Sequence, residues 1–195
     1  MQVSEKSRAL RKAPEIIVMG GAFFDCGKRG PQAEFNIHPD SAAARKVLEF
    51  CRTSSADLPN SDHLPLTFVG LDVSHRVILE RSSISALQIQ MGKLAAGISS
   101  HYMEFYRTVL GVDGCPLHDP LAMAVALHPE LVVREPYHVE IVSSPTCPDT
   151  DGITVADYRP CVRFKDRTKE VTEVCVSVNS QAFLDDFLLQ IKNSL

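Results

Sequence analysis

The chain has 195 residues, of which 45% are hydrophobic, so it can bury a sizeable core or form a large part of a bigger domain. Its formal net charge of -4 leaves no basic footprint, which argues against nucleic acid as a partner and keeps a small-molecule ligand open. No stretch reaches the roughly 18 apolar residues of a membrane helix and residues 1–12 are not signal-like, so we expect no membrane partner and a cytoplasmic location.

The cysteines are scattered along the chain, and none are paired at the close spacing of a zinc knuckle or a redox motif. This distribution favours reduced thiols over disulfides or a structural zinc site. The interpretation covers all six cysteines: Cys26, Cys51, Cys115, Cys147, Cys161 and Cys175.

The first predicted element is a buried strand at residues 15–19, an apolar run that is closed by two glycines. After a long loop, Asp40 and Ser41 precede an Ala-rich helical stretch at residues 42–51 as cap residues. A second strand-like run follows at residues 66–71. Because strand, loop, helix and strand follow one another, the sequence predicts an α/β fold with a parallel sheet.

Residues 85–111 carry apolar side chains at helical spacing, and the face that includes Tyr102, Phe105 and Val109 is predicted to be core. Asp119 and the following proline indicate the start of another helix, with Asp119 near the N-cap. The N-terminal end of that helix would favour an anion or a polar ligand. Three further strands and a closing amphipathic helix are expected at residues 139–142, 153–155, 174–178 and 181–195.

Six short motifs occur in one order along the chain: VMGGA at 18–22, PQAEFN at 31–36, DSAA at 40–43, VGLDVS at 69–74, LHDPLA at 117–122 and GITVAD at 152–157. In this order they resemble the nucleoside hydrolase family, the inosine-uridine-preferring ribohydrolases. The match is strongest over residues 13–159, and an ordered set of motifs is far more specific than any one of them.

The resemblance implies hydrolysis of the N-glycosidic bond of purine or pyrimidine nucleosides to base and ribose, in nucleoside salvage. It also implies a Rossmann-like, open, mostly parallel sheet with flanking helices, here truncated at the N-terminus, so that residues 1–195 form a partial nucleoside hydrolase domain. The nucleoside would bind at the C-terminal ends of the strands. Homo-oligomers are usual in the family, whereas base preference depends on variable loops.

Calcium is the cofactor that the resemblance implies, and its ligands are only partly present. The family begins with a strand ending in an Asp-x-Asp-x-x-x-Asp-Asp cluster, which this sequence lacks together with the catalytic base. Asp119 matches the one calcium ligand of the C-terminal half, which also faces the ribose hydroxyls. Calcium takes six to eight oxygens, so one carboxylate cannot hold it, and the chain alone is expected not to bind calcium. The alternative role of Asp119 is a simple helix cap.

Four other residues match positions of the family's site. His118 matches the position that protonates or polarises the leaving base, a task that suits imidazole. Glu34 and Asn36 match residues that grip the ribose hydroxyls, and their alternation around Phe35 predicts an extended segment with both side chains on one side. Met19 matches a residue that packs against the sugar, with a core position as the alternative.

Other polar residues are given smaller roles. Lys28 stands where the family usually has an asparagine that contacts the 5'-hydroxyl, so it either points to solvent or changes the sugar recognition. Asp72 and Ser74 are interpreted as fold maintenance. Asp151 and Asp157 are interpreted as solvated turn residues.

Three hypotheses follow for the whole chain. In the leading one, it descends from ribonucleoside hydrolases and is catalytically silent alone, because the metal centre and the base are missing. In the second, it is a non-catalytic protein that binds a nucleoside or ribose or associates with a relative. In the third, the sequence is an incomplete gene product and the complete protein is an ordinary hydrolase.

Overall fold

The computed structural model describes residues 12–24, 32–52, 64–83, 100–158 and 171–193. Two compact units make up the chain: residues 1–72 with 133–177, and residues 73–132 with 178–195. Among the described residues, no helix is both long enough and apolar enough to cross a bilayer.

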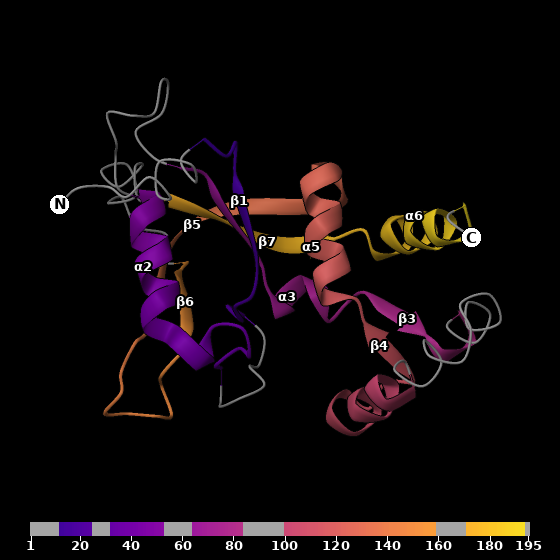
Figure 1. The fold of residues 1–195 in the computed structure, drawn as a ribbon, viewed down its shortest axis with the longest axis horizontal. Helices are drawn as coiled ribbons and strands as arrows, with labels where there is room; N and C mark the ends of the chain where they lie inside the picture. The colour runs from indigo at the N-terminus through magenta and orange to yellow at the C-terminus, as the bar shows by residue number, and fades with distance from the viewer. Residues whose placement is uncertain (1–11, 25–31, 53–63, 84–99, 159–170, 194–195) are drawn as a thin grey trace. The chain divides into compact units, whose positions relative to one another are not determined.

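The first unit is built on a five-stranded sheet with the order β1-β2-β7-β5-β6 (Figure 1). β2 pairs in parallel with both β1 and β7, whereas β5 and β6 are antiparallel neighbours. The α/β prediction is therefore confirmed, and the sheet is mixed because it contains both parallel and antiparallel pairs. The strands are β1 (Ile16–Met19), β2 (Leu66–Val69), β5 (Val132–Ile141), β6 (Thr154–Asp157) and β7 (Val171–Val178).

β2 is the most deeply buried strand of this sheet. All four of its residues, Leu-Thr-Phe-Val, are buried, as expected for a strand with a parallel neighbour on each side. Phe68 packs with Leu48 of helix α2 (Ser41–Arg52) and with Val174 of β7 in the main apolar cluster. Asp40 caps α2, accepting a hydrogen bond from the Ala43 amide at 2.8 Å, as the sequence predicts.

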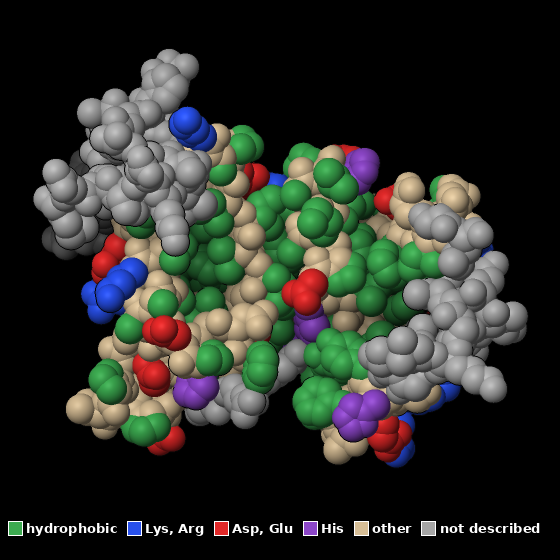
Figure 2. Space-filling model, viewed as in Figure 1, with side chains coloured by type: hydrophobic (Ala, Val, Ile, Leu, Met, Phe, Trp, Pro, Cys, Tyr) green, Lys and Arg blue, Asp and Glu red, His purple; other side chains and the backbone are tan. Residues whose placement is uncertain are grey.

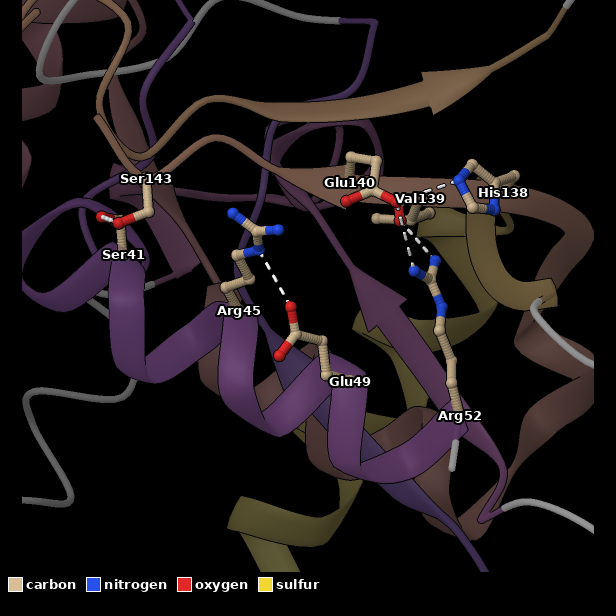
Figure 3. Close-up of polar contacts among 8 residues, drawn as sticks. All are labelled: Ser41, Arg45, Glu49, Arg52, His138, Val139, Glu140 and Ser143. Carbon is tan, nitrogen blue, oxygen red and sulfur yellow. Dashed lines mark hydrogen bonds and ion pairs between the residues drawn. The ribbon is translucent and has the colours of Figure 1, made fainter. Parts of the chain in front are cut away.

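The C-terminal end of α2 is tied to β5 by Arg52, as Figure 3 shows. The guanidinium of Arg52 donates to the carbonyl oxygen of Val139 and lies 3.6 Å from the carboxylate of Glu140. His138 contacts the same carboxylate at 2.9 Å. One turn earlier in α2, the exposed ion pair of Arg45 and Glu49 contributes little to stability, because water screens the two charges.

The N-terminal end of α2 is tied to the loop before β6 by Asp151. Its Oδ1 accepts hydrogen bonds from the Ser41 hydroxyl at 2.7 Å and from the Ser144 amide at 2.9 Å. These bonds lower the pKa of the Asp151 carboxyl, the Ser41 bond having the larger effect. Asp151 lies in a turn, as interpreted, but it is partly buried and joins two segments. The interpretation as a turn residue is wrong for Asp157, which belongs to β6.

The second unit contains a short antiparallel ribbon and helices. β3 (Ile78–Glu80) pairs with β4 (Gly114–Pro116), and the helices are residues 100–110, α5 (His118–Leu127) and α6 (Ser180–Asn193). Sequence periodicity missed β3 and β4, because three residues are too few to show alternation. Hydrophobic side chains are exposed over α5 in Figure 2, and among its residues Met123 and Leu127 are 64% and 68% exposed.

The helix at residues 100–110 buries a different face from the one predicted. Tyr102, Phe105 and Val109, expected in the core, are 40–48% exposed, whereas Met103 and Tyr106 are 2% exposed. The core-face prediction is therefore wrong for this part of the helix. The rest of the predicted segment, residues 85–99, lies outside the described residues.

The described cysteines are free thiols, as predicted. Three of them are buried, and burial raises the pKa of the Cys175 thiol to about 12. A buried thiol of this kind is unreactive, because the thiolate is the nucleophile. The four described cysteines are Cys51, Cys115, Cys147 and Cys175.

Candidate functional site

In the first unit, three of the predicted site residues lie together at the C-terminal end of β1. The Asn36 side-chain amide donates to the Met19 carbonyl oxygen at 3.3 Å and lies 3.1 Å from the Met19 sulfur. The carboxylate of Glu34 accepts hydrogen bonds from the amides of Asn36 at 2.8 Å and Gly21 at 3.3 Å. Parallel sheets place ligands at this end of their strands.

The geometry around Glu34 differs from the prediction. Residues 35–37 form a turn, in which the Ile37 and His38 amides donate to the Glu34 carbonyl oxygen, so the prediction of an extended segment is wrong. Phe35 is 49% exposed, whereas Glu34 is 2% exposed. Glu34 thus uses its carboxylate on backbone amides, and the exposed amide of Asn36 is the group best placed for a ligand hydroxyl.

The loop after β1 is held by two other buried side chains. The carboxylate of Asp72 accepts hydrogen bonds from the amides of Phe23 at 3.1 Å and Phe24 at 2.6 Å, and the Thr154 hydroxyl accepts one from Ala22 at 2.9 Å. A Cβ at Gly70 would lie 2.7 Å from this carboxylate, so the approach requires glycine. Asp72 therefore orders the loop, as the fold-maintenance interpretation of it expects.

In the second unit, a line of polar groups runs through His118. The Tyr106 hydroxyl lies 2.7 Å from His118 Nε2, and the Ser74 hydroxyl lies 2.8 Å from Nδ1. The Tyr102 hydroxyl donates to that of Tyr106 at 3.3 Å. Tyr102 is 40% exposed, whereas the other three residues are buried: Tyr106 is 2% exposed, His118 8% and Ser74 0%. The line thus begins at the surface of this unit and ends in its interior.

The hydroxyl of Tyr102, at the exposed end of this line, has a raised pKa. Burial raises the pKa of the Tyr102 hydroxyl, the hydrogen bond with Tyr106 opposes this, and the charges of Cys115 and Asp119 add to the rise. Tyr102 therefore stays protonated near neutral pH and can donate a hydrogen bond. Asp119 is exposed, and its charge acts on the Tyr102 hydroxyl.

The helix-cap alternative for Asp119 is wrong. Helix α5 begins one residue earlier, at His118, and Leu117 occupies the N-cap position with no side-chain hydrogen bond. Asp119 lies within the first turn, where the helix dipole favours a negative charge. Its carboxylate is thus available to a ligand, although the structure by itself assigns it none.

The structure brings the predicted residues together in two groups: Met19, Glu34 and Asn36 in one unit, His118 and Asp119 in the other. Lys28 lies outside the described residues. Sequence reasoning missed Tyr102 and Tyr106 as partners of His118, and assigned Ser74 only to the fold. The sequence feature that could have indicated this partnership is the spacing of the two tyrosines, which lie one helical turn apart. It was overlooked because Tyr102 was assigned to the apolar core face of the predicted helix.

The fit of the described residues to calcium is poor. Within this part of the chain, no three His, Cys, Asp or Glu side chains are grouped so that they could hold a metal ion. Calcium needs six to eight oxygen ligands, and the carboxylate of Asp119 supplies at most two. Calcium bound at this site would therefore require carboxylates beyond the described residues.

The family model for inosine-uridine preferring nucleoside hydrolases matches residues 1–185. The pyrimidine-specific ribonucleoside hydrolase RihA of Salmonella gallinarum is 31% identical over 178 residues, which are 89% of this chain and 51% of that protein. RihA of an Enterobacter species is 30% identical over 179 residues. The chain thus spans about half the length of these curated relatives.

The chain also resembles solved structures of nucleoside hydrolases. The purine-preferring ribonucleoside hydrolase from Gardnerella vaginalis superposes with a TM-score of 0.74 and 29% identity, over 96% of this chain and 57% of that one. A plant nucleoside hydrolase, PpNRh1, has the same fold, with a TM-score of 0.69 and 23% identity over 93% of this chain and 56% of that one. The order of motifs, the open α/β sheet and the family model agree. The chain therefore belongs to the inosine-uridine preferring nucleoside hydrolase family.

Proposed function

We propose that this chain supplies the leaving-base and ribose-binding residues of a ribonucleoside N-ribohydrolase, which cleaves the N-glycosidic bond to give base and ribose. The observation that carries the proposal is the hydrogen-bonded line from Ser74 through His118 and Tyr106 to Tyr102. Such a line can move a proton between a buried imidazole and the surface of its unit without moving any heavy atom far.

The chemistry at the leaving base needs a proton donor. As the glycosidic bond breaks, the sugar becomes oxocarbenium-like and negative charge develops on the departing base, which protonation relieves. A proton on His118 Nε2 can pass to the Tyr106 oxygen, while the Tyr106 proton passes to Tyr102 and the Tyr102 proton passes to the base. After the transfer, Tyr102 donates to Tyr106 and Tyr106 donates to Nε2. The Tyr102 and Tyr106 hydroxyl oxygens lie 3.3 Å apart, a distance at which Tyr102 can donate to Tyr106 in this way.

The ribose side rests on the cluster at the end of β1. Asn36, exposed and anchored to Met19, offers an amide that can both donate to and accept from ribose hydroxyls. Glu34 positions Asn36 by accepting its backbone hydrogen. We assign Met19 to the wall of the sugar pocket and Asp119 to the ribose hydroxyls by their match to the family's positions.

Activation of the attacking water is assigned to calcium and to carboxylates that the described residues do not provide. It follows that the 195-residue chain alone should be catalytically silent, whereas a protein that also contains the aspartate cluster should hydrolyse nucleosides.

A second candidate is a non-catalytic protein that binds a nucleoside or ribose. It is favoured by one observation: Met19, Glu34 and Asn36 are held together by hydrogen bonds within the first unit. Ribose binding by the chain without calcium, with no turnover under any condition, would select this candidate.

The test is release of ribose from inosine and uridine by the purified chain, with and without calcium, and with and without the N-terminal half of the Salmonella gallinarum relative. We expect no release by the chain alone and calcium-dependent release after the N-terminal half is added. Turnover by the chain alone would overturn the silent state and require other metal ligands. No turnover in the complemented mixture, when that half is folded and bound, would remove the hydrolase proposal.

A further inference from the structure

Ser74 is buried beside His118 in the second unit, and its hydroxyl lies 2.8 Å from the ring nitrogen Nδ1. The sequence interpretation assigned Ser74 only to maintenance of the fold. A hydroxyl that is 0% exposed and hydrogen-bonded to an imidazole can instead determine which ring nitrogen carries the hydrogen.

The backbone holds Ser74 and His118 in place without help from this hydrogen bond. The Leu117 amide donates to the carbonyl oxygen of Val77 at 3.0 Å, and Ile78 pairs with Pro116 in the β3–β4 ribbon. The segments carrying the two side chains therefore run beside one another as part of a backbone ladder. The Ser74 hydroxyl is not needed to assemble the site, so it is available for a chemical task.

We infer that Ser74 is a positioning residue for His118, which keeps the hydrogen on Nδ1 and leaves Nε2 as the nitrogen that exchanges a proton with Tyr106. The inference rests on the proposed function and deepens it. The Tyr106 hydroxyl lies within hydrogen-bond distance of both the Tyr102 hydroxyl and His118 Nε2, and its one hydrogen can point to Nε2 while its oxygen accepts from Tyr102. Nε2 is then an acceptor, and Nδ1 carries the ring hydrogen and donates it to Ser74.

This arrangement has a consequence for proton transfer. With Ser74 accepting from Nδ1, the same hydrogen bond persists whether or not Nε2 carries a proton, and only Nε2 faces the tyrosines. Without Ser74, a buried Nδ1–H has no acceptor from this side chain, and the hydrogen shifts to Nε2, where the Tyr106 oxygen accepts it. The hydrogen bond between His118 and Tyr106 would then be reversed, with Nε2 as the donor and the Tyr106 oxygen as the acceptor.

The first experiment reads the tautomer directly, by nitrogen-15 NMR of the His118 ring in the full 195-residue chain, assigned with His118→Gln. We expect the Nδ1–H form in the unaltered protein and in Ser74→Thr, which retains the hydroxyl, and a shift to the Nε2–H form in Ser74→Ala. An Nε2–H ring in the unaltered protein overturns the inference, and this holds even if the alanine variant does not fold. A folded Ser74→Ala protein that keeps Nδ1–H overturns it as well.

Ser41→Ala is the matched control, because it also removes a buried, hydrogen-bonded serine hydroxyl but in the first unit. Its His118 ring should keep the unaltered tautomer. A tautomer change in this control would attribute the effect to general loss of packing and would count against Ser74 as a specific positioning residue.

The second experiment uses the protein complemented with the N-terminal half and compares two leaving groups. Hypoxanthine in inosine needs a proton to leave, whereas 4-nitrophenolate in 4-nitrophenyl riboside leaves as an anion. Ser74→Ala should lower kcat for inosine by roughly 10- to 100-fold, the effect seen when a group that orients a metal-ligating histidine is removed. It should leave 4-nitrophenyl riboside hydrolysis unchanged, and Ser74→Thr should retain activity on both.

The outcomes separate the two proposals. An equal loss on both substrates overturns the positioning role, because it shows damage unrelated to leaving-group protonation. If the complemented protein hydrolyses neither substrate, the proposed function fails, and the NMR result still decides whether Ser74 sets the His118 tautomer.

Discussion

At the scale of single residues, the polar side chains near the candidate sites differ in burial and in what they contact. Glu34 and Asp72 are buried carboxylates whose oxygens accept backbone amides, so they order the loops around the end of β1. Tyr102 and Asn36 are exposed, and the proposed function assigns their polar groups to the ligand. His118 is buried but is connected to the surface of its unit through the hydroxyls of Tyr106 and Tyr102.

Tyr106→Phe tests the connection between His118 and the surface. The ring contacts with Tyr102 and Phe105, at centroid distances of 4.8 and 5.1 Å, should survive, while the hydroxyl that bonds Nε2 is lost. In the complemented protein we expect inosine kcat to fall about 100-fold, the lower range for loss of an acid–base step. Steady-state kinetics checks this, with Tyr137→Phe as the surface control. Equal kcat in Tyr106→Phe and the unaltered protein would refute the proton path.

Glu34→Ala tests the buried carboxylate by stability. The change leaves the amides of Gly21 and Asn36 without their acceptor, at about 1–3 kcal/mol for each buried group. We expect the free energy of unfolding in urea to fall by about 2–4 kcal/mol, because Asn36 is partly solvated. Glu34→Gln keeps an acceptor oxygen and should lose less. If both variants lose the same amount, the amide contacts are not the cause.

At the scale of elements, Asp151 connects α2 to the loop before β6 through Ser41 and Ser144. Its pKa is held below the ordinary value of 3.8, chiefly by the Ser41 hydrogen bond. A depressed pKa in the folded state means that the stabilisation is present above the ordinary value and is lost as pH falls through the depressed one. Asp151→Asn should therefore lower the Tm at pH 7, and the difference should shrink in acid below 3.8. A difference that is constant with pH in thermal melts would contradict this.

Gly114 tests the β3–β4 ribbon that positions the segment before His118. A Cβ at this position would lie 2.5 Å from the Leu79 carbonyl oxygen, which the paired backbone cannot accommodate. Gly114→Ala should separate the strands and destabilise the protein by more than Gly111→Ala. Gly111 has a φ of 69° but open space around it, so its cost is limited to about 1–2 kcal/mol of backbone strain. Urea unfolding of both variants makes the comparison, and equal losses would argue against the steric explanation.

At the scale of the whole molecule, the chain matches its family over residues 1–185 and spans about half the length of its curated relatives. The described residues include no group that could hold a metal ion. A ligand that binds only the folded state raises the Tm. We expect this chain alone not to bind calcium, so calcium at millimolar concentration should leave its Tm unchanged. Scanning fluorimetry with magnesium as the control checks this. A rise of several degrees specific to calcium would reveal a site.

Much of the fold could be predicted from the sequence, because it depends on local patterns. The apolar runs that became β1 and β2, the Asp40 cap of α2 and the closing helix are signalled by neighbouring residues along the chain. The ordered motifs identified the family, and they did so without any contact being known. Both kinds of inference need only residue types and spacing.

The tertiary structure decided what depends on distant residues. The burial of Tyr106 rather than Tyr102, the turn that aims the Glu34 carboxylate at two backbone amides, and the β3–β4 ribbon all arise from contacts between separated segments. Ser74 and His118 are 44 residues apart, so no periodicity could pair them. The sequence by itself therefore determined the family and most elements, while the hydrogen-bond partners of the site residues were decided only by folding, because a hydrogen bond depends on position in space.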